Sequence, residues 1–282
     1  MTLKITPLSG TIGAEISGID LRNLSNSEFD AFHRAFLDHA VLCFRDQDLT
    51  PDDQIAFARR WGEIHDHPYL NGLPDHPEII EIVKEAGERN RFGAYWHTDQ
   101  IFTPTPAMAT ILYAKEVPPV GGDTMFASLT SAYDALSDGM KAMASRLRTF
   151  NLYDKQSPRS KRMAEKIPSR ETAAEPATHP LVRIHPETKK PALYVNGMPT
   201  TTHFVGMTQD ESQPLIRHFL KHATRPEFTC RIRWSPGALG IWDNRCLLHM
   251  ALDDYADYHR VMHRITIKGD ATIGIHDLEA AE

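Results

Sequence analysis

The segment FTCRIRW at 228–234 alternates between apolar and polar side chains. Because successive side chains of a strand point to opposite faces, this pattern predicts a β-strand with one buried and one solvated face. Short strand-like runs occur on both sides of it along the chain: VLCF at 41–44, EIIEIV at 78–83, LVRI at 181–184 and VMHRITIKG at 261–269. Turn-forming residues separate many of these runs, which favours a mainly β fold.

Helical patterns are inserted between the strands. One is predicted from Ser25 to His39, where Ser25 and Glu28 form a capping box, and another from Thr208 to His222. A helix also begins at Thr50, and the stretch 132–147 reads as a helix broken near Ser137. Without a regular βαβ rhythm, the chain fits a β-sandwich or jelly roll, a double-stranded β-helix, decorated by helices.

The composition narrows the class of protein. The net charge of −6 argues against a mainly electrostatic nucleic-acid binder, which needs a basic face. No stretch approaches the roughly 18 apolar residues of a membrane span, and no signal peptide is visible. The three cysteines are odd in number and widely spaced, as expected in a reducing cytoplasm.

The chain shows no linker-like change of composition, so we expect a single domain over residues 1–282. The stretch 154–178 is long, polar and almost without apolar anchors. Such a segment is typical of a lid or a flexible insertion.

The segment YWHTD at 95–99 carries the clearest chemical signal. On a strand, residues two apart share a face, so His97 and Asp99 are expected to converge on one point. An imidazole and a carboxylate make two thirds of the two-histidine, one-carboxylate triad that binds Fe(II) and leaves positions open for O₂ and a co-substrate. His249, which follows the strand-like GIWDN and a short turn, is the best candidate for the third ligand.

Two alternatives to this interpretation are a different cluster of ligands and a different metal. The sequence His65-Asp66-His67 is a second cluster of ligand types, although it lies in a predicted loop and adjacent side chains on a strand diverge. A zinc site is the chemical alternative, but zinc often uses cysteines or three histidines, and no CxxC pair is present.

A pair of arginines could bind an anion near such a metal. Arg260 and Arg264 lie four residues apart, so they share a face if the segment is a strand. The planar guanidinium binds carboxylates through two hydrogen bonds, which suits the far carboxylate of 2-oxoglutarate. Two solvated strand arginines are the alternative, and that is our interpretation of Arg231 and Arg233.

Together these pieces resemble the taurine dioxygenase-like family of Fe(II)/2-oxoglutarate-dependent dioxygenases over nearly the whole chain. The matching segments are ITPLSGTIGAEISGIDL at 5–21, WHTD at 96–99, PPVGGDT at 118–124, HPETKKPALYVN at 185–196, WDNRCLLH at 242–249 and RVMHR at 260–264. The resemblance implies that His97, Asp99 and His249 bind Fe(II). It also implies hydroxylation rather than halogenation, since related halogenases have a small residue, which frees a site for halide, where this chain has Asp99.

The resemblance assigns further roles in the same site. Thr124 is similar to the residue whose hydroxyl contacts the far carboxylate of 2-oxoglutarate, and Arg260 to the arginine that pairs with it. Arg264 is similar to the arginine that binds the anionic group of the prime substrate, and His67 matches a position that contacts substrate. The segment around His203 looks closer to the members acting on aryloxyacetates, where a nearby histidine contacts the substrate.

The implied function is hydroxylation of a small organic anion, an aryloxyalkanoate-type carboxylate or a sulfonate or sulfate, with release of succinate and CO₂. Taurine itself is one alternative, but Gly93 stands where the taurine enzymes carry an asparagine. A cupin-like protein that binds a small anion without turnover is another, and a zinc hydrolase is a third. Family members are often dimers or tetramers, so a homo-oligomer is expected.

Overall fold

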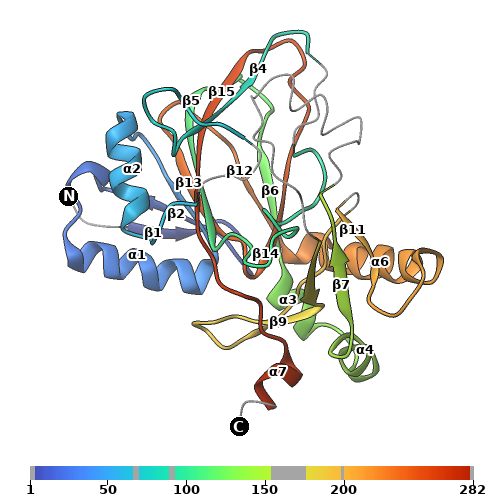
Figure 1. Ribbon diagram of the computed structural model, residues 1–282. Coiled ribbons are helices and arrows are strands. Elements are labelled where there is room, and N and C mark those ends of the chain that lie inside the picture. Colours follow the sequence, from blue (N-terminus) through green and yellow to red (C-terminus); the bar gives the residue numbers. More distant parts are fainter. Residues whose placement is uncertain (1–3, 66–69, 89–92, 154–175, 198–199, 280–282) are drawn as a thin grey trace.

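The computed structural model describes residues 4–65, 70–88, 93–153, 176–197 and 200–279, which form a mixed, strand-rich α/β structure (Figure 1). Its largest sheet has the strand order β1-β2-β3-β13-β5-β15-β4. These strands are β1 (Lys4–Pro7), β2 (Ala14–Ser17), β3 (Val41–Phe44), β13 (Leu239–Asp243), β5 (Ala109–Glu116), β15 (Arg260–Ile267) and β4 (Ile80–Lys84).

Three smaller sheets complete the described strands. One contains β12 (Thr229–Ile232), β6 (Thr124–Ser128) and β14 (Leu247–Ala251), and another β11 (Thr201–Phe204), β7 (Arg148–Asn151) and β8 (Ala177–Pro180). The last pairs β10 (Pro191–Leu193) with β9 (Val182–Ile184).

The large sheet and the β12-β6-β14 sheet pack against each other through one apolar layer. Cys43 and Leu112 of the large sheet share a core cluster with Phe126, Ile232 and other residues of the smaller one. The neighbouring residues along the strands face outward into two other clusters, as the alternation of a strand requires. The interior between the two sheets is therefore where side chains from distant strands meet.

Helices cover the outer faces of both sheets (Figure 1). The helices are α1 (Asn26–His39), α2 (Pro51–Arg59), α3 (Leu129–Asp134), α4 (Asp138–Ala144), α6 (Gln209–Ala223) and α7 (Ile275–Glu279), with short 3-10 turns η1 (Leu21–Asn23) and η2 (Pro226–Phe228). Phe32, Phe36 and Phe57 pack α1 and α2 onto the large sheet. Leu129 of α3 and Phe219 of α6 pack in one apolar cluster with Ala127 and Leu248 of the β12-β6-β14 sheet.

Most local predictions from the sequence are confirmed. Ser25 and Thr208 are N-caps with complete capping boxes, at the starts of α1 and α6. The alternating segment at 228–234 contains β12, and Cys230, Ile232 and Trp234 lie in the core between the sheets. The predicted break near Ser137 in the helical stretch 132–147 is also confirmed, because Ser137 caps the start of α4 after α3 has ended at Asp134.

Two predictions need correction or fall outside the structure. The segment 95–99 is not a strand: His97 forms only an isolated bridge, and Asp99 lies in the turn that follows. Most of the predicted lid, 154–175, lies outside the described residues, whereas Ala177 and Thr178 already belong to β8. No helix in the described part of the chain is long and apolar enough to cross a membrane.

Candidate metal centre

Backbone pairing brings the two predicted histidine ligands together. The N–H of His97 donates to the carbonyl of His249 at 3.0 Å, and the N–H of His249 donates back at 2.8 Å. Their ring centroids are 4.1 Å apart. His249 lies on β14, and the bridge places His97 beside it. Asp99 follows in a turn, so His97 and Asp99 come together without the predicted strand at 95–99.

Asp99 completes a group of three ligand types. Its Oδ1 lies 3.8 Å from Nε2 of His97, and its Oδ2 lies 3.7 Å from Nε2 of His249. One donor atom from each residue lies within 4.8 Å of the others. Nδ1 of His97 is 2.7 Å from the carbonyl of Tyr95, so this nitrogen carries the proton and leaves the lone pair on Nε2.

The charges of these groups suit a divalent metal ion. Burial lowers the pKa of His249 well below its ordinary value, so the ring is neutral. Burial tends to raise the pKa of the Asp99 carboxyl, but the adjacent Arg264 guanidinium, together with the hydrogen bond from Thr110, holds the pKa below its usual range. Two imidazoles and one carboxylate are the donor set of an open, three-ligand site.

The carboxylate of Asp99 also has two close protein partners. Nη2 of Arg264 lies 2.8 Å from Oδ1. The hydroxyl of Thr110, on β5, donates to Oδ2 at 2.6 Å. Arg264 is thus part of the site, in contact with a candidate metal ligand.

Arg260 is a buried cation whose guanidinium is incompletely hydrogen-bonded within the described residues. It lies on the same face of β15 as Met262 and Arg264, facing the space between the two sheets. Among the described residues, its buried Nε and Nη2 have no hydrogen-bond partner. Burial lowers the pKa of Arg260, yet arginine begins so far above neutrality that it stays charged. A buried, incompletely paired charge is unfavourable unless a ligand compensates it.

Thr124 lies at the start of β6, next to Asp123, whose charge acts on Arg260. Its hydroxyl oxygen accepts a hydrogen bond from Nε1 of Trp234 at 3.0 Å, which leaves its own proton to donate. A hydroxyl donor and a guanidinium in one neighbourhood can together bind a carboxylate.

The two predicted substrate histidines have different outcomes. His67 lies outside the described residues. His203 lies on β11, in another sheet, where its ring stacks on Phe150 at 4.7 Å and its Nδ1 is 2.8 Å from the Thr202 hydroxyl. None of these contacts connects His203 to the triad.

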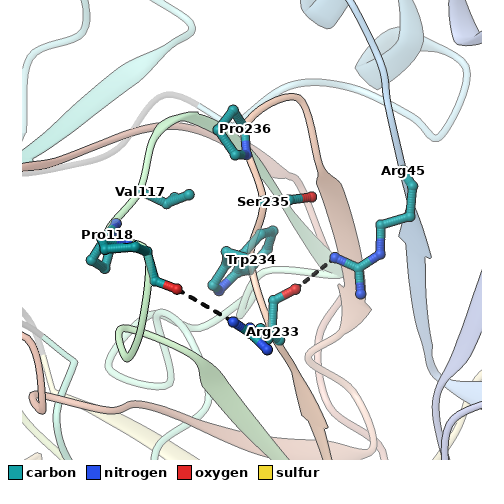
Figure 2. Close-up of a pocket in the computed structure, with 8 residues that line it drawn as sticks. Arg45, Val117, Pro118, Arg233, Trp234, Ser235 and Pro236 are labelled. Atoms are coloured by element: carbon teal, nitrogen blue, oxygen red, sulfur yellow. Dashed lines mark hydrogen bonds between the residues drawn. The ribbon is translucent and has the colours of Figure 1, made fainter.

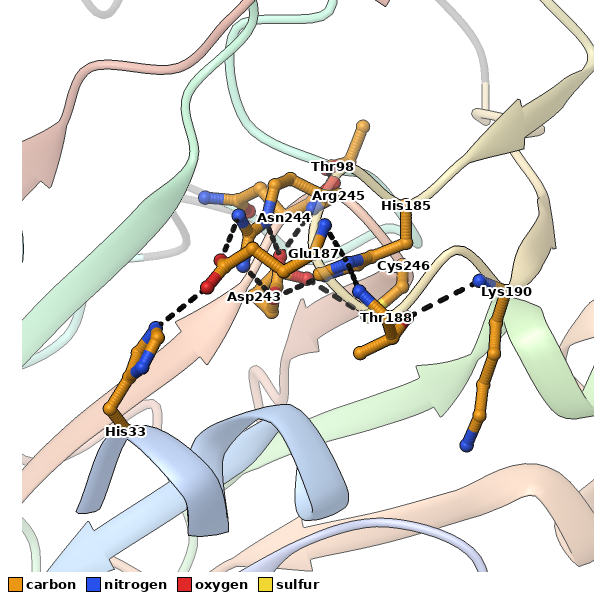
Figure 3. A network of polar contacts seen from close by, with 10 residues as sticks. All are labelled: His33, Thr98, His185, Glu187, Thr188, Lys190, Asp243, Asn244, Arg245 and Cys246. Atoms are coloured by element: carbon orange, nitrogen blue, oxygen red, sulfur yellow. Dashed lines mark hydrogen bonds and ion pairs between the residues drawn. The ribbon is translucent and has the colours of Figure 1, made fainter. Parts of the chain in front are cut away.

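His185, Asp243 and Cys246 form a second cluster of ligand types, but His185 and Asp243 already belong to a network of polar contacts with Arg245 (Figure 3). Nδ1 of His185 accepts two backbone N–H groups, so Nε2 carries the proton and donates to Asp243 at 3.0 Å. Both oxygens of Asp243 accept from the guanidinium of Arg245. The network fixes the turn between β13 and β14.

A surface cavity of about 550 Å³ is separate from the triad. Figure 2 shows its lining, which includes Arg45, Arg233 and Trp234. Both arginines already donate to backbone carbonyls, those of Arg233 and Pro119. Trp234, through its bond to Thr124, is the connection to the interior site.

Asp99 contacts two residues that were not predicted from the sequence, namely Thr110 and Asn244. Asn244 is part of the WDNRCLLH segment, but its neighbour Asp99 is far away in the chain. Thr110 lies in the buried first part of β5, between apolar residues, and an interior polar residue there is the signal that the sequence offers.

Comparison with known proteins agrees with this site. Residues 4–266 match the family described as Taurine catabolism dioxygenase TauD, TfdA family. The chain is 36% identical to the alkylsulfatase of Acinetobacter baylyi, over 98% of this chain and 88% of that protein. It is 33% identical to the (S)-phenoxypropionate/alpha-ketoglutarate-dioxygenase of Sphingobium herbicidovorans, over 94% and 95%.

A solved structure shares the fold as well. The crystal structure of AAD-2 in complex with Mn(II) and N-oxalylglycine superposes with a TM-score of 0.78 at 30% identity, covering 97% of this chain and all of that one (100%).

Proposed function

The chain belongs to the Taurine catabolism dioxygenase TauD, TfdA family and is an alpha-ketoglutarate-dependent dioxygenase, and from this premise we propose that it hydroxylates a small organic anion. The observation that carries the proposal is the convergence of two imidazoles and an ionised carboxylate beside two buried arginines. The products from 2-oxoglutarate (alpha-ketoglutarate) would be succinate and CO₂.

His97, Asp99 and His249 would hold Fe(II) in this scheme. Their donor set fits because His249 is neutral, Asp99 is ionised and His97 has its Nδ1 held at the carbonyl of Tyr95, which turns Nε2 toward the other two residues. The AAD-2 complex with Mn(II) supports a divalent metal in this fold. When bound, Fe(II) supplies the activation of O₂ and the oxidation of the substrate C–H bond.

Arg260 and Thr124 would bind the far carboxylate of 2-oxoglutarate. The incomplete pairing of Arg260 and the free proton of Thr124 support this role. N-oxalylglycine, present in the AAD-2 complex, has the shape and both carboxylates of 2-oxoglutarate with one methylene replaced by N–H. Burial of this ion pair would orient the co-substrate and exclude water from it.

Arg264 would bind the anionic group of the prime substrate. Its position beside Asp99 places a cation next to the proposed reaction centre. The relatives named above suggest two substrate classes, a sulfate ester and an aryloxyalkanoate, and both carry an anion that a guanidinium binds well. A sulfonate, taurine among them, is the alternative, and His67 and His203 are further candidates for substrate contacts.

We also propose the wider organisation of the protein. The two facing sheets are consistent with a double-stranded β-helix, or jelly roll, forming a single domain over residues 1–282. The free thiols of Cys43, Cys230 and Cys246 favour the cytoplasm. A dimer or tetramer is expected, and light scattering on the purified protein tests it.

The test is succinate release from 2-oxoglutarate with Fe(II), ascorbate and air, against a panel of alkyl sulfates, aryloxyalkanoates, alkanesulfonates and taurine. Strong stimulation by one class supports the proposal and names the substrate. Metal binding without succinate release from any member would instead favour a cupin-like protein that binds a small anion. Turnover that needs zinc but no O₂ would favour a hydrolase.

A further inference from the structure

A closed ring of hydrogen bonds holds Asp99 at both its backbone and its side chain. The hydroxyl of Thr110 donates to Oδ2 of Asp99 at 2.6 Å. Nδ2 of Asn244 donates to the same hydroxyl oxygen at 2.9 Å, and Oδ1 of Asn244 accepts the backbone N–H of Asp99 at 3.4 Å. The carboxylate is therefore fixed relative to its own backbone through two other side chains.

The ring is buried, and its hydrogen-bond directions are settled. Thr110 and Asn244 are fully buried, as is most of Asp99. The single hydroxyl proton of Thr110 goes to the carboxylate, because an ionised carboxylate can only accept. Asn244 must then donate to Thr110, which also sets its amide so that Oδ1 faces the N–H of Asp99. Hydrogen bonds to charged groups in a dry interior are stronger than average.

Asn244 is itself held in place by its neighbours in the chain. It lies between Asp243 and Arg245 of the ion-pair network (Figure 3). Its carbonyl also accepts the hydroxyl proton of Thr98 at 2.8 Å. The turn between β13 and β14 thus supports the loop that carries His97 and Asp99, in addition to leading into β14 with His249.

We propose that Thr110 and Asn244 are positioning residues, which hold the Asp99 carboxylate in one orientation and so set the affinity and symmetry of the metal centre. The inference rests on the proposed function, since it takes Asp99 to be a metal ligand. Neither residue touches the donor atoms of the two histidines in the described contacts, so their effect passes through Asp99. Supporting hydrogen bonds of this kind typically change metal affinity by about 10- to 100-fold.

The test uses Thr110→Val, which keeps the shape and removes the hydroxyl, and Thr110→Ser, which restores it. Thr266→Val is the matched control, because Thr266 pairs with Thr110 across β5 and β15, is buried, and has a hydroxyl without a partner among the described residues. The readouts are the dissociation constant for Mn(II) and the visible spectrum of the Co(II) protein. Neither needs turnover.

We expect Thr110→Val to weaken Mn(II) binding about 10-fold or more and to change the Co(II) spectrum, with Thr110→Ser near wild type. Thr266→Val should match wild type in both. Wild-type affinity and spectrum in a folded Thr110→Val protein would overturn the inference. Should that variant not fold, Thr110→Ala provides the same comparison, with the same expected direction.

Failure of the proposed function gives a different result. Wild-type protein that binds Mn(II) but releases no succinate with any of these anions would contradict the proposed hydroxylation of a small organic anion and leave the positioning role intact. Wild-type protein that binds no divalent metal would overturn both.

Discussion

His97 and His249, from distant parts of the chain, exchange two backbone hydrogen bonds, so a bridge fixes the spacing of their main chains, and their ring centroids lie 4.1 Å apart. The carboxylate of Asp99 lies between their Nε2 atoms, within 4 Å of each. A preformed site of this kind loses little conformational entropy when a metal binds. With three protein ligands in an open site, each of them should be needed to bind the metal ion.

Replacing either histidine ligand should abolish metal binding. In His97→Ala or His249→Ala, two ligands remain, which is too few to hold a divalent ion in an open site. Bound iron, measured by elemental analysis after reconstitution, should fall from one ion per chain to near zero, and succinate release should stop. His203→Ala is the control and should retain its metal. Normal iron content in both ligand variants would refute the triad.

Arg260→Gln should weaken binding of 2-oxoglutarate. The loss of a charge-assisted pair of about 1.5–3 kcal/mol corresponds to a rise of about 10- to 150-fold in KM for 2-oxoglutarate. Mn(II) affinity should be unchanged, since Arg260 has no contact with the triad among the described residues. Arg233→Gln removes an exposed arginine and should leave KM as it is. An unaltered KM in Arg260→Gln would remove this residue from the site.

Arg264→Gln should show the reverse pattern of Arg260→Gln. If Arg264 binds the anionic group of the prime substrate, KM for that substrate should rise about 10-fold or more, with a much smaller change for 2-oxoglutarate. Steady-state kinetics with each substrate varied in turn separate the two effects. Equal increases in both KM values would mean that the main role of Arg264 is its ion pair with Asp99.

Breaking the buried ion pair between Asp243 and Arg245 should destabilise the fold. Arg245→Met leaves the fully buried carboxylate of Asp243 with His185 as its one remaining side-chain partner in the network, beside the backbone N–H of residue 245, at an expected cost of about 3–5 kcal/mol in the free energy of unfolding. Asp243→Asn combined with Arg245→Met should recover part of this loss. Glu187→Gln, at the partly exposed edge of the network, should change stability by about 1 kcal/mol or less. Urea denaturation measures all three.

The free energy of unfolding should fall in acid, in part because His179 becomes protonated. Burial lowers the pKa of this imidazole from 6.5 to about 4. The unfolded chain therefore binds more protons between these values, so stability is present above pH 6.5 and is lost as pH falls toward 4, by up to about 3 kcal/mol. Unfolding free energies of His179→Gln should decline less steeply than those of wild type between pH 6.5 and 4.5. Parallel curves would contradict this assignment.

Local features of the structure could be read from the sequence. The capping boxes at Ser25 and Thr208 are confirmed because each involves residues only three apart, and β12 because its alternation lies within one short segment. Such patterns depend on neighbours along the chain, which are always present whatever the rest of the protein does.

The candidate metal site could be predicted only in part from the sequence. The sequence alone determined the ligand types, the order of His97, Asp99 and His249, and the class of chemistry they permit. The tertiary structure decided that a bridge rather than a strand sets the spacing at His97, and that Thr110 and Asn244 hold Asp99. Those contacts depend on strand register and on the packing of two sheets, and no short stretch of sequence contains both partners.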